Sequence, residues 1–103
     1  QILSFINENI FNSVSVENVA NALNLSVRQT SRICHRLFGH SVGQVITKVQ
    51  LREISKLLID SNSSIAEIAE ISGFASPYSF SRHFSHYTGV TPSAYRRRYE
   101  IRS

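Results

Sequence analysis

The sequence predicts an all-α fold of seven helices, in which two similar halves are joined by a long linker helix. Strand signals are nearly absent, since no segment alternates apolar and polar residues and no Asn-Gly or Asp-Gly hairpin turn occurs. Apolar residues recur instead at helical spacing, between residues that cap helices. The order of caps and turns then repeats in the second half of the chain.

Helix starts are marked by six Ser or Thr residues that precede apolar segments: Ser15, Ser26, Ser41, Ser64, Ser76 and Thr91. The side-chain oxygen of such a residue accepts a hydrogen bond from a free N–H of the first turn. Gln or Glu three residues later completes a capping box at Ser26, Ser41 and Ser64. Pro follows Ser76 and Thr91, at the favoured first helical position. With caps and stops included, the expected helices cover residues 2–10, 15–23, 26–39, 41–61, 64–73, 76–88 and the segment from 91 through Arg98.

The expected core lies on the apolar faces of these helices. The first helix places Leu3 and three isoleucines, Ile2, Ile6 and Ile10, near a period of 3.6 residues. The long helix offers six apolar side chains for burial: Val45, Val49, Leu51, Ile54, Leu57 and Leu58.

The repeat carries the same turn signature twice. Ser15 falls on Ser64 at an offset of 49 residues, and after the turn Ser26 falls on Ser76 at an offset of 50. Each turn has a small alanine that permits close helix crossing, then a residue that tolerates positive φ, then an apolar corner residue. These residues are Ala20, Asn24 and Leu25 in the first copy and Ala69, Gly73 and Phe74 in the second.

Two helix-turn-helix subdomains are therefore expected at residues 1–40 and 62–103, joined by a linker helix at 41–61. The second helix of each copy, about 27–38 and 77–88, divides into two faces. The inward positions are Thr30, Cys34 and Leu37 in the first copy, with Ile33 at the boundary, and Phe80, Phe84 and Tyr87 in the second. Cys34 is thus interpreted as a core residue and not as a nucleophile.

The outward faces of these two helices carry hydrogen-bond donors and no acids. Arg28, Gln29, Ser31, Arg32, His35 and Arg36 remain outward in the first copy, and Tyr78, Ser79, Ser81, Arg82, Ser85 and His86 in the second. Arginine can pair with guanine, glutamine with adenine, and serine with bases or phosphates. A merely solvated face usually mixes signs, so this pattern favours an electronegative groove such as that of DNA.

Composition excludes several other classes. The formal net charge of +4 favours a polyanionic partner. A single cysteine excludes an intrachain disulfide and fits a reducing cytosol. His83 and His86 lack a third ligand at metal spacing, so both are expected at the surface. No apolar run approaches about 18 residues, so no membrane span is expected. Paired carboxylates, a nucleophile with a base and a phosphate loop are all missing, so neither an enzyme nor a cofactor is expected.

The chain resembles the DNA-binding domain of the AraC/XylS family of bacterial transcription regulators. The resemblance rests on SVENVANALNLSVRQTSRICHRLFGHSVGQVI and on SIAEIAEISGFASPYSFSRHFSHYTGVTPSAYRRR. It implies two recognition helices in adjacent major-groove segments of one DNA face. One departure lies in the linker, where Gln50-Leu51 leads to Ile54 in place of the family's Arg-Leu followed by Ala.

The resemblance also implies which residues face the bases. The family's base-facing positions fall on Arg28, Ser31 and Arg32 in the first recognition helix. In the second they fall on Pro77, Tyr78, Ser81 and Arg82; Gln29 joins them on its chemistry alone. Because Pro77 and Tyr78 are poor hydrogen-bonding readers, the second helix is expected to discriminate less.

Phosphate contacts are expected from helix N-termini and from basic side chains. The candidates are Ser15, Arg36, Lys48, Arg52, Ser64, His86, Thr91, Arg96 and Arg97. The Arg96–Arg98 run has an equally good alternative interpretation as a solubilising terminus.

The expected partner is double-stranded promoter DNA, read as two unlike boxes about one turn apart. A linker helix of this length rises roughly 27–30 Å, close to the ~34 Å of one DNA turn. RNA polymerase, and an effector or dimerisation domain outside this sequence, are further expected partners, in the bacterial cytoplasm at the nucleoid. The alternative is a helical protein-interaction module that does not bind DNA.

Overall fold

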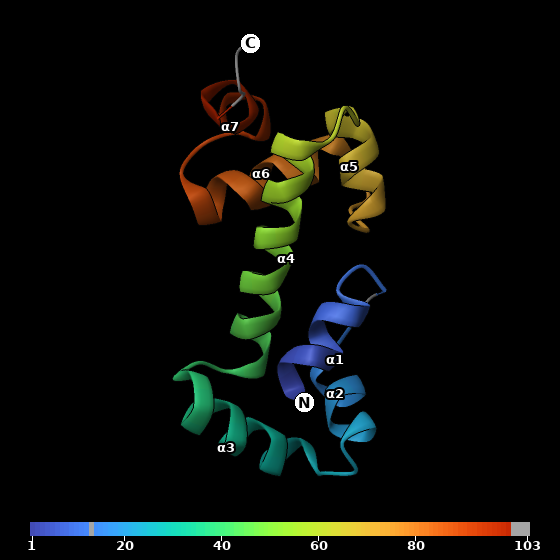
Figure 1. Cartoon of the computed structure of the whole chain (residues 1–103), viewed down its shortest axis with the longest axis vertical. Helices are drawn as coiled ribbons and strands as arrows, with labels where there is room; N and C mark the ends of the chain where they lie inside the picture. The colour runs from blue at the N-terminus through green and yellow to red at the C-terminus, as the bar shows by residue number, and fades with distance from the viewer. Residues whose placement is uncertain (13, 100–103) are drawn as a thin grey trace. The chain divides into compact units, whose positions relative to one another are not determined.

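The structure is a computed structural model that describes residues 1–12 and 14–99 (Figure 1). Within these residues it contains seven α-helices and no strand, which confirms the predicted fold class. The end of the expected second subdomain, residues 100–103, lies outside the described residues. The helices are α1 (Ile2–Asn9), α2 (Val16–Ala22), α3 (Val27–Phe38), α4 (Val42–Asp60), α5 (Ile65–Ile71), α6 (Pro77–Thr88) and α7 (Pro92–Tyr99).

The chain divides into two compact units, Gln1–Gln50 and Leu51–Ser103. The boundary falls inside α4, so this helix contributes its first half to one unit and its second half to the other. The linker helix is continuous over 19 residues, and it begins and ends within a residue or two of the expected bounds.

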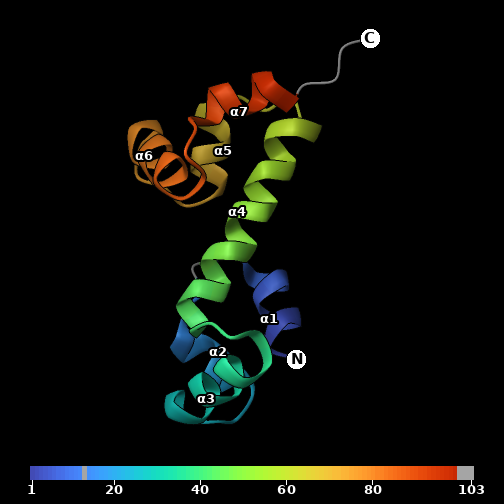
Figure 2. The same ribbon diagram turned by 90° about the vertical axis from the view of Figure 1, so that its left-hand side faces the viewer.

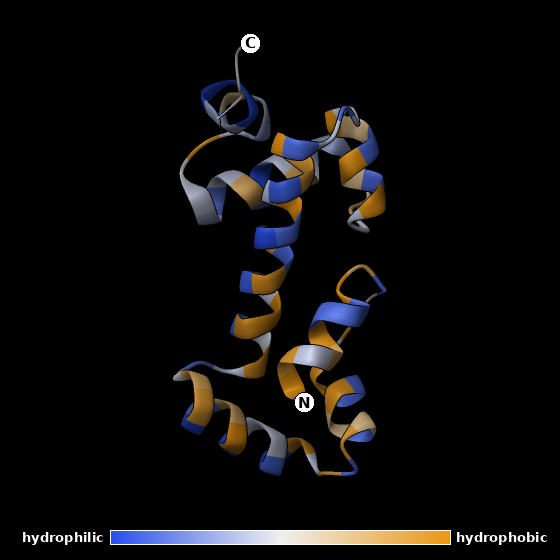
Figure 3. Ribbon diagram, in the orientation of Figure 1, coloured by the Kyte–Doolittle hydropathy of each residue, from blue (hydrophilic) through white to orange (hydrophobic). Residues whose placement is uncertain are grey.

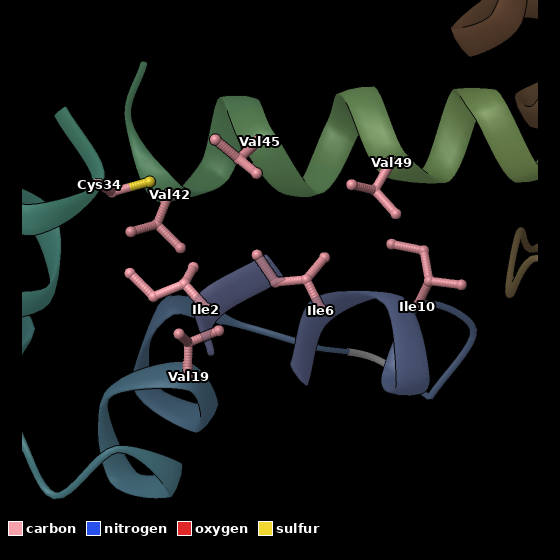
Figure 4. Close-up of a cluster of buried hydrophobic side chains, with 8 residues drawn as sticks. All are labelled: Ile2, Ile6, Ile10, Val19, Cys34, Val42, Val45 and Val49. Atoms are coloured by element: carbon pink, nitrogen blue, oxygen red, sulfur yellow. The ribbon is translucent and has the colours of Figure 1, made fainter. Parts of the chain in front are cut away.

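The core of the first unit forms where α1 and the first half of α4 face each other. Figure 4 shows the isoleucines of α1 pointing toward the valines of α4, with Val19 and Cys34 closing the same cluster. Cys34 is fully buried, as expected of a core residue, and burial raises the pKa of its thiol. The buried members are Ile2, Ile6, Ile10, Val19, Cys34, Val42, Val45 and Val49.

In the second unit α5 packs against α6 and α6 against α7, and Figure 2 shows these helices beside the second half of α4. Ile54 and Leu58 of α4 are buried together with Ile68 of α5. Phe80 and Phe84 of α6 are fully buried, and the Phe84 ring lies edge-on to Tyr95 of α7 at 5.4 Å between centroids. Phe80 and Phe84 thus occupy the positions that the smaller Thr30 and Cys34 occupy in the first unit.

Both turns have the same hydrogen-bond pattern, and it is a Schellman motif. In the first unit the N–H of Leu25 donates to Ala20 O (2.9 Å) and that of Asn24 to Asn21 O (3.2 Å). In the second unit Phe74 N–H donates to Ala69 O and Gly73 N–H to Glu70 O, both at 3.0 Å. Asn24 has φ +58° and Gly73 φ +84°, so the predicted left-handed residues are confirmed.

Two predicted core positions are wrong. Leu37 is 63% exposed and Tyr87 is 54% exposed, although both continue the apolar stripe of their helix. In α3 the inward place in the last turn is taken by Phe38, four residues after Cys34, which turns Leu37 outward. In the first unit Phe38 is partly buried against the core at that turn. The hydropathy colouring in Figure 3 shows how apolar and polar residues alternate along these helices.

The other apolar expectations hold in part. Leu3 is 36% exposed on α1, and Leu51 and Leu57 of α4 are only half-buried. The remaining expected residues of α1 and α4 are buried.

Candidate nucleic-acid interface

The two candidate recognition helices, α3 and α6, begin at equivalent serine caps. Ser26 Oγ accepts from Gln29 N–H at 3.0 Å, and Ser76 Oγ accepts from Ser79 N–H at 3.1 Å. Both helices end at a glycine in the left-handed region, Gly39 and Gly89. The repeat therefore fixes the start and end of each helix at the same place in its unit.

The outward face of α3 carries a row of three arginines. Arg28, Arg32 and Arg36 are all exposed and stand at intervals of four residues, which places them on one stripe of the helix. The helix contains no acidic residue, and none of the three has an ion pair within the part of the chain that the structure describes. Ser31, beside this row, is half-buried.

Gln29 has a structural role at the start of α3. Its Oε1 accepts from Ser26 N–H at 3.0 Å and completes the capping box. Bidentate reading of adenine needs both the oxygen and the amide NH₂. Gln29 can therefore donate to DNA as it stands, but can accept from a base only by giving up the box.

The outward face of α6 carries Tyr78, Ser81 and Arg82. Tyr78 is 72% exposed, and the guanidinium carbon of Arg82 lies 5.7 Å from the centroid of its ring. Arg82 is exposed and Ser81 half-buried; Pro77 is exposed at the first helical position. Unlike α3, this face pairs its arginine with an aromatic ring.

Each helix has a groove along the same face. The groove on α3 has a volume of about 180 Å³ and the one on α6 about 440 Å³. Four pairs of lining residues correspond under the offset of 50 residues: Gln29 and Ser79, Arg32 and Arg82, Ile33 and His83, Arg36 and His86. The grooves are thus the same feature of the repeat, lined by different side chains.

His83 is half-buried, so the expectation that it lies at the surface holds only in part. Its ring packs between Phe74 and Tyr87, at 5.1 and 4.9 Å between centroids. Its Nε2 is buried without a hydrogen-bond partner among the described residues. Burial, and then the positive charge of His86, lower the pKa of His83. The equivalent Ile33 could have indicated this position from the sequence.

Arg96 is engaged inside the second unit. Its Nε donates to Leu58 O at 2.7 Å, and one terminal nitrogen lies 3.4 Å from Ser61 O and 3.5 Å from Leu57 O. These carbonyls belong to the last turn of α4 or follow it, so Arg96 caps that helix from α7. Arg97 and Arg98 are exposed.

The other phosphate candidates differ in their surroundings. Ser15 and Ser64 cap α2 and α5, but each helix carries an acid in its first turn, Glu17 and Glu67. An acid there competes with phosphate for the positive end of the helix. Thr91 Oγ accepts from Ala94 N–H at 3.1 Å, and the first turn of α7 contains no acid.

The basic candidates of α4 lie on either side of the unit boundary. Lys48 is exposed. The Arg52 side chain is 57% exposed, with Nε 3.9 Å from Glu53 Oε2. The described residues hold no group of three or more metal-ligating side chains, and none of their helices is long and apolar enough to cross a membrane.

Comparison with known proteins places these features in a family. A family model described as a helix-turn-helix domain matches residues 19–98. The multiple antibiotic resistance protein MarA of Escherichia coli K12 is 35% identical over 95 residues, which are 92% of this chain and 75% of MarA. The melibiose operon regulatory protein of the same strain is 32% identical over 97 residues, covering 94% of this chain. The match spans only 32% of that protein's own length.

A solved structure gives the same result. The DNA-binding domain of AdpA, crystallised in complex with a target DNA, superposes with a TM-score of 0.84 at 28% sequence identity, covering 95% of this chain and 88% of that one. Fold, turn geometry and sequence thus agree. The chain belongs to the AraC family of helix-turn-helix domains, which consists of DNA-binding transcription regulators and not of enzymes.

Proposed function

We propose that this chain binds double-stranded DNA in a sequence-specific manner, with α3 and α6 as recognition helices in the major groove. The observation that carries the proposal is the arginine row of α3. Like charges four residues apart destabilise a helix by about 0.2–0.5 kcal/mol per pair. Arg28, Arg32 and Arg36 form two such pairs without a compensating acid on the helix. A phosphate-rich groove removes this repulsion, and arginine also pairs with guanine there.

The two helices contact different DNA segments, which we call the first box (contacted by α3) and the second box (contacted by α6). Their exposed residues differ, so the boxes are unlike in sequence. The proposed base-contacting residues are Arg28, Gln29, Ser31 and Arg32 for the first box and Tyr78, Ser81 and Arg82 for the second.

Phosphate contacts come from the ends and flanks of the same helices. Thr91 is the best-supported N-terminal contact because no acid stands in the first turn of α7. Arg97 replaces Arg96 as the main cation of α7, because Arg96 is committed to α4. The remaining proposed contacts are Ser15, Arg36, Lys48, Arg52, Ser64 and His86.

The parent protein is proposed to be a bacterial transcription activator with a further effector or dimerisation domain. The support is that the chain spans 32% of the melibiose operon regulatory protein and 36% of the lactose operon transcription activator of Staphylococcus xylosus. RNA polymerase is the proposed protein partner, and the bacterial cytoplasm, at the nucleoid, the proposed location.

Selection of preferred duplexes from a random pool tests the DNA proposal. Two unlike boxes about one helical turn apart are expected, whereas a palindrome would indicate a different assembly. On the selected site, Arg32→Ala and Arg82→Ala should each weaken binding by roughly 1–3 kcal/mol. Wild-type affinity for the selected site no greater than for random duplex, at two salt concentrations, would overturn sequence-specific binding.

A further inference from the structure

The second recognition helix carries a preformed pair of side chains. Tyr78 and Arg82 stand one helical turn apart in the first half of α6, and the guanidinium carbon lies 5.7 Å from the centroid of the ring. A cation at this position is attracted by the negative face of the ring. No carboxylate of the described residues forms an ion pair with Arg82. The ring is therefore the group that orients this guanidinium.

The equivalent positions of the first unit differ. Arg28 and Arg32 stand where Tyr78 and Arg82 stand in the second unit, so the first unit has no aromatic face there for its arginine. The first unit thus presents two exposed arginines at these positions, whereas α6 presents an arginine beside an aromatic ring. Tyr78 stays 72% exposed in this pair, so much of its apolar surface remains available to a partner.

Base chemistry in the major groove matches both members of the pair. A guanidinium can donate two hydrogen bonds to guanine O6 and N7, and an apolar surface can contact the C5-methyl group of thymine. Four residues of helix rise about 6 Å, which corresponds to roughly two base-pair steps of about 3.4 Å. N-terminal residues of a recognition helix contact base edges. Both members can therefore reach bases of the same box.

We infer that the Tyr78–Arg82 pair reads a guanine together with a thymine within about two base pairs of it in the second box. This inference rests on the proposed DNA binding and adds its base preference. Tyr78 contributes in two ways: its ring contacts the thymine methyl, and it holds the guanidinium of Arg82 toward guanine. At the position of Tyr78, where hydrogen bonding to bases is poor, α6 therefore distinguishes thymine from the other bases by an apolar contact.

Removal of single atoms from the DNA tests the inference. The duplex obtained by selection is prepared with uracil in place of each thymine of the second box in turn, which removes only the methyl group. One of these substitutions should weaken wild-type binding about three- to fivefold, the value of one buried methyl group. Replacing the partner guanine by 7-deazaguanine removes one acceptor and should weaken binding about three- to tenfold.

Variants of Tyr78 separate its two contributions. Tyr78→Ala should abolish the sensitivity to uracil and reduce the sensitivity to 7-deazaguanine, whereas Tyr78→Phe should keep both because the ring remains. Arg82→Ala should abolish the sensitivity to 7-deazaguanine alone. A variant that merely lost its fold would lose binding to both boxes, so uracil and 7-deazaguanine in the first box serve as the internal control.

The outcomes distinguish this inference from the underlying proposal. Wild-type binding that is unchanged by uracil at every thymine of the second box would overturn the inference while leaving DNA binding intact. Equal 7-deazaguanine sensitivity in the wild type and Tyr78→Ala would overturn the orienting role of the ring. Absence of any site preference, in the first box as well, would overturn the proposed function itself.

Discussion

His83 occupies the place of Ile33 in the other unit, and its lowered pKa predicts that the second unit loses stability as the pH falls. Burial lowers the pKa of His83 below its ordinary value near 6.5. Between the two values the unfolded chain binds more protons than the folded chain, so the free energy of unfolding falls with falling pH. The contribution of His83 to the free energy of unfolding is fully present above about pH 6.5. It is lost as the pH falls toward the lowered pKa of His83.

The matched variant is His83→Ile, because isoleucine is the residue of the first unit. The wild type should lose thermal stability between pH 7.5 and 5.5, followed by circular dichroism because the chain has no tryptophan. The variant should lose less thermal stability over this pH range. At pH 7.5 it should be at least as stable as the wild type, because the buried unpaired Nε2 is gone. Identical slopes for the two proteins would contradict this account of His83.

Arg96 and Arg97 are neighbours with opposite expected roles. Arg96→Ala removes charge-assisted hydrogen bonds to the end of α4 and should destabilise the protein by about 1–3 kcal/mol in urea unfolding. Arg97→Ala should leave stability nearly unchanged because the side chain is exposed. It should instead weaken binding to all duplexes alike and lower the salt dependence of binding. An exchange of these two phenotypes would show that the roles are reversed.

At the scale of the element, the arginine row that we expect to bind DNA should also lower the stability of the α3 helix. Arg32 stands between Arg28 and Arg36, so Arg32→Gln removes both like-charge pairs of the helix. Free of DNA at low salt, this variant should gain up to about 0.4–1 kcal/mol of stability, and the gain should shrink at high salt. Its affinity for the selected site should fall. Unchanged stability at low salt would show that the arginine row carries no strain.

The helices and their turns could be predicted from the sequence because local chemistry determines them. Serine caps, left-handed Asn24 and Gly73, and the apolar periods all act within one turn of chain. The exposure of Leu37 and Tyr87 could not be predicted, because periodicity gives the direction of a side chain but not whether a neighbouring helix reaches it. That depends on which other elements pack against the helix at that turn.

The candidate site also has features that could be predicted from the sequence and features that could not. The outward placement of the basic residues followed from helical spacing, and the structure finds the arginine row of α3 exposed. Three features depend on where side-chain atoms lie. Gln29 closes its own capping box, Arg96 reaches carbonyls 35 to 39 residues away in sequence, and Arg82 stacks on Tyr78. No spacing rule predicts which of several possible partners a long side chain takes.

At the scale of the whole molecule, two units with different exposed faces share the helix α4. The first half of α4 is held by the core of the first unit through Val42, Val45 and Val49, and the second half by Ile54 and Leu58. Between Val49 and Ile54 no residue of α4 is buried. Each half of α4 is therefore anchored in the core of its own unit.

The continuous α4 helix predicts that binding affinity depends on the number of base pairs between the two boxes. A continuous helix of 19 residues is stiff, so five base pairs inserted between the boxes should remove nearly all of the contribution of one box to wild-type affinity. Insertion of Gly-Ser-Gly-Ser between Gln50 and Leu51 interrupts the helix where it carries no buried side chain. This variant should bind the original site more weakly than the wild type.

The variant should also bind the original site and the lengthened site with nearly equal affinity, because a flexible connection couples the boxes only through effective concentration. Its helix content and its affinity for the first box alone provide the control that both units remain folded. If the variant instead discriminated box spacing as strongly as the wild type, the rigidity would have to reside in contacts other than the helical backbone of α4. The α4 helix would then join the two units without setting the spacing that they read.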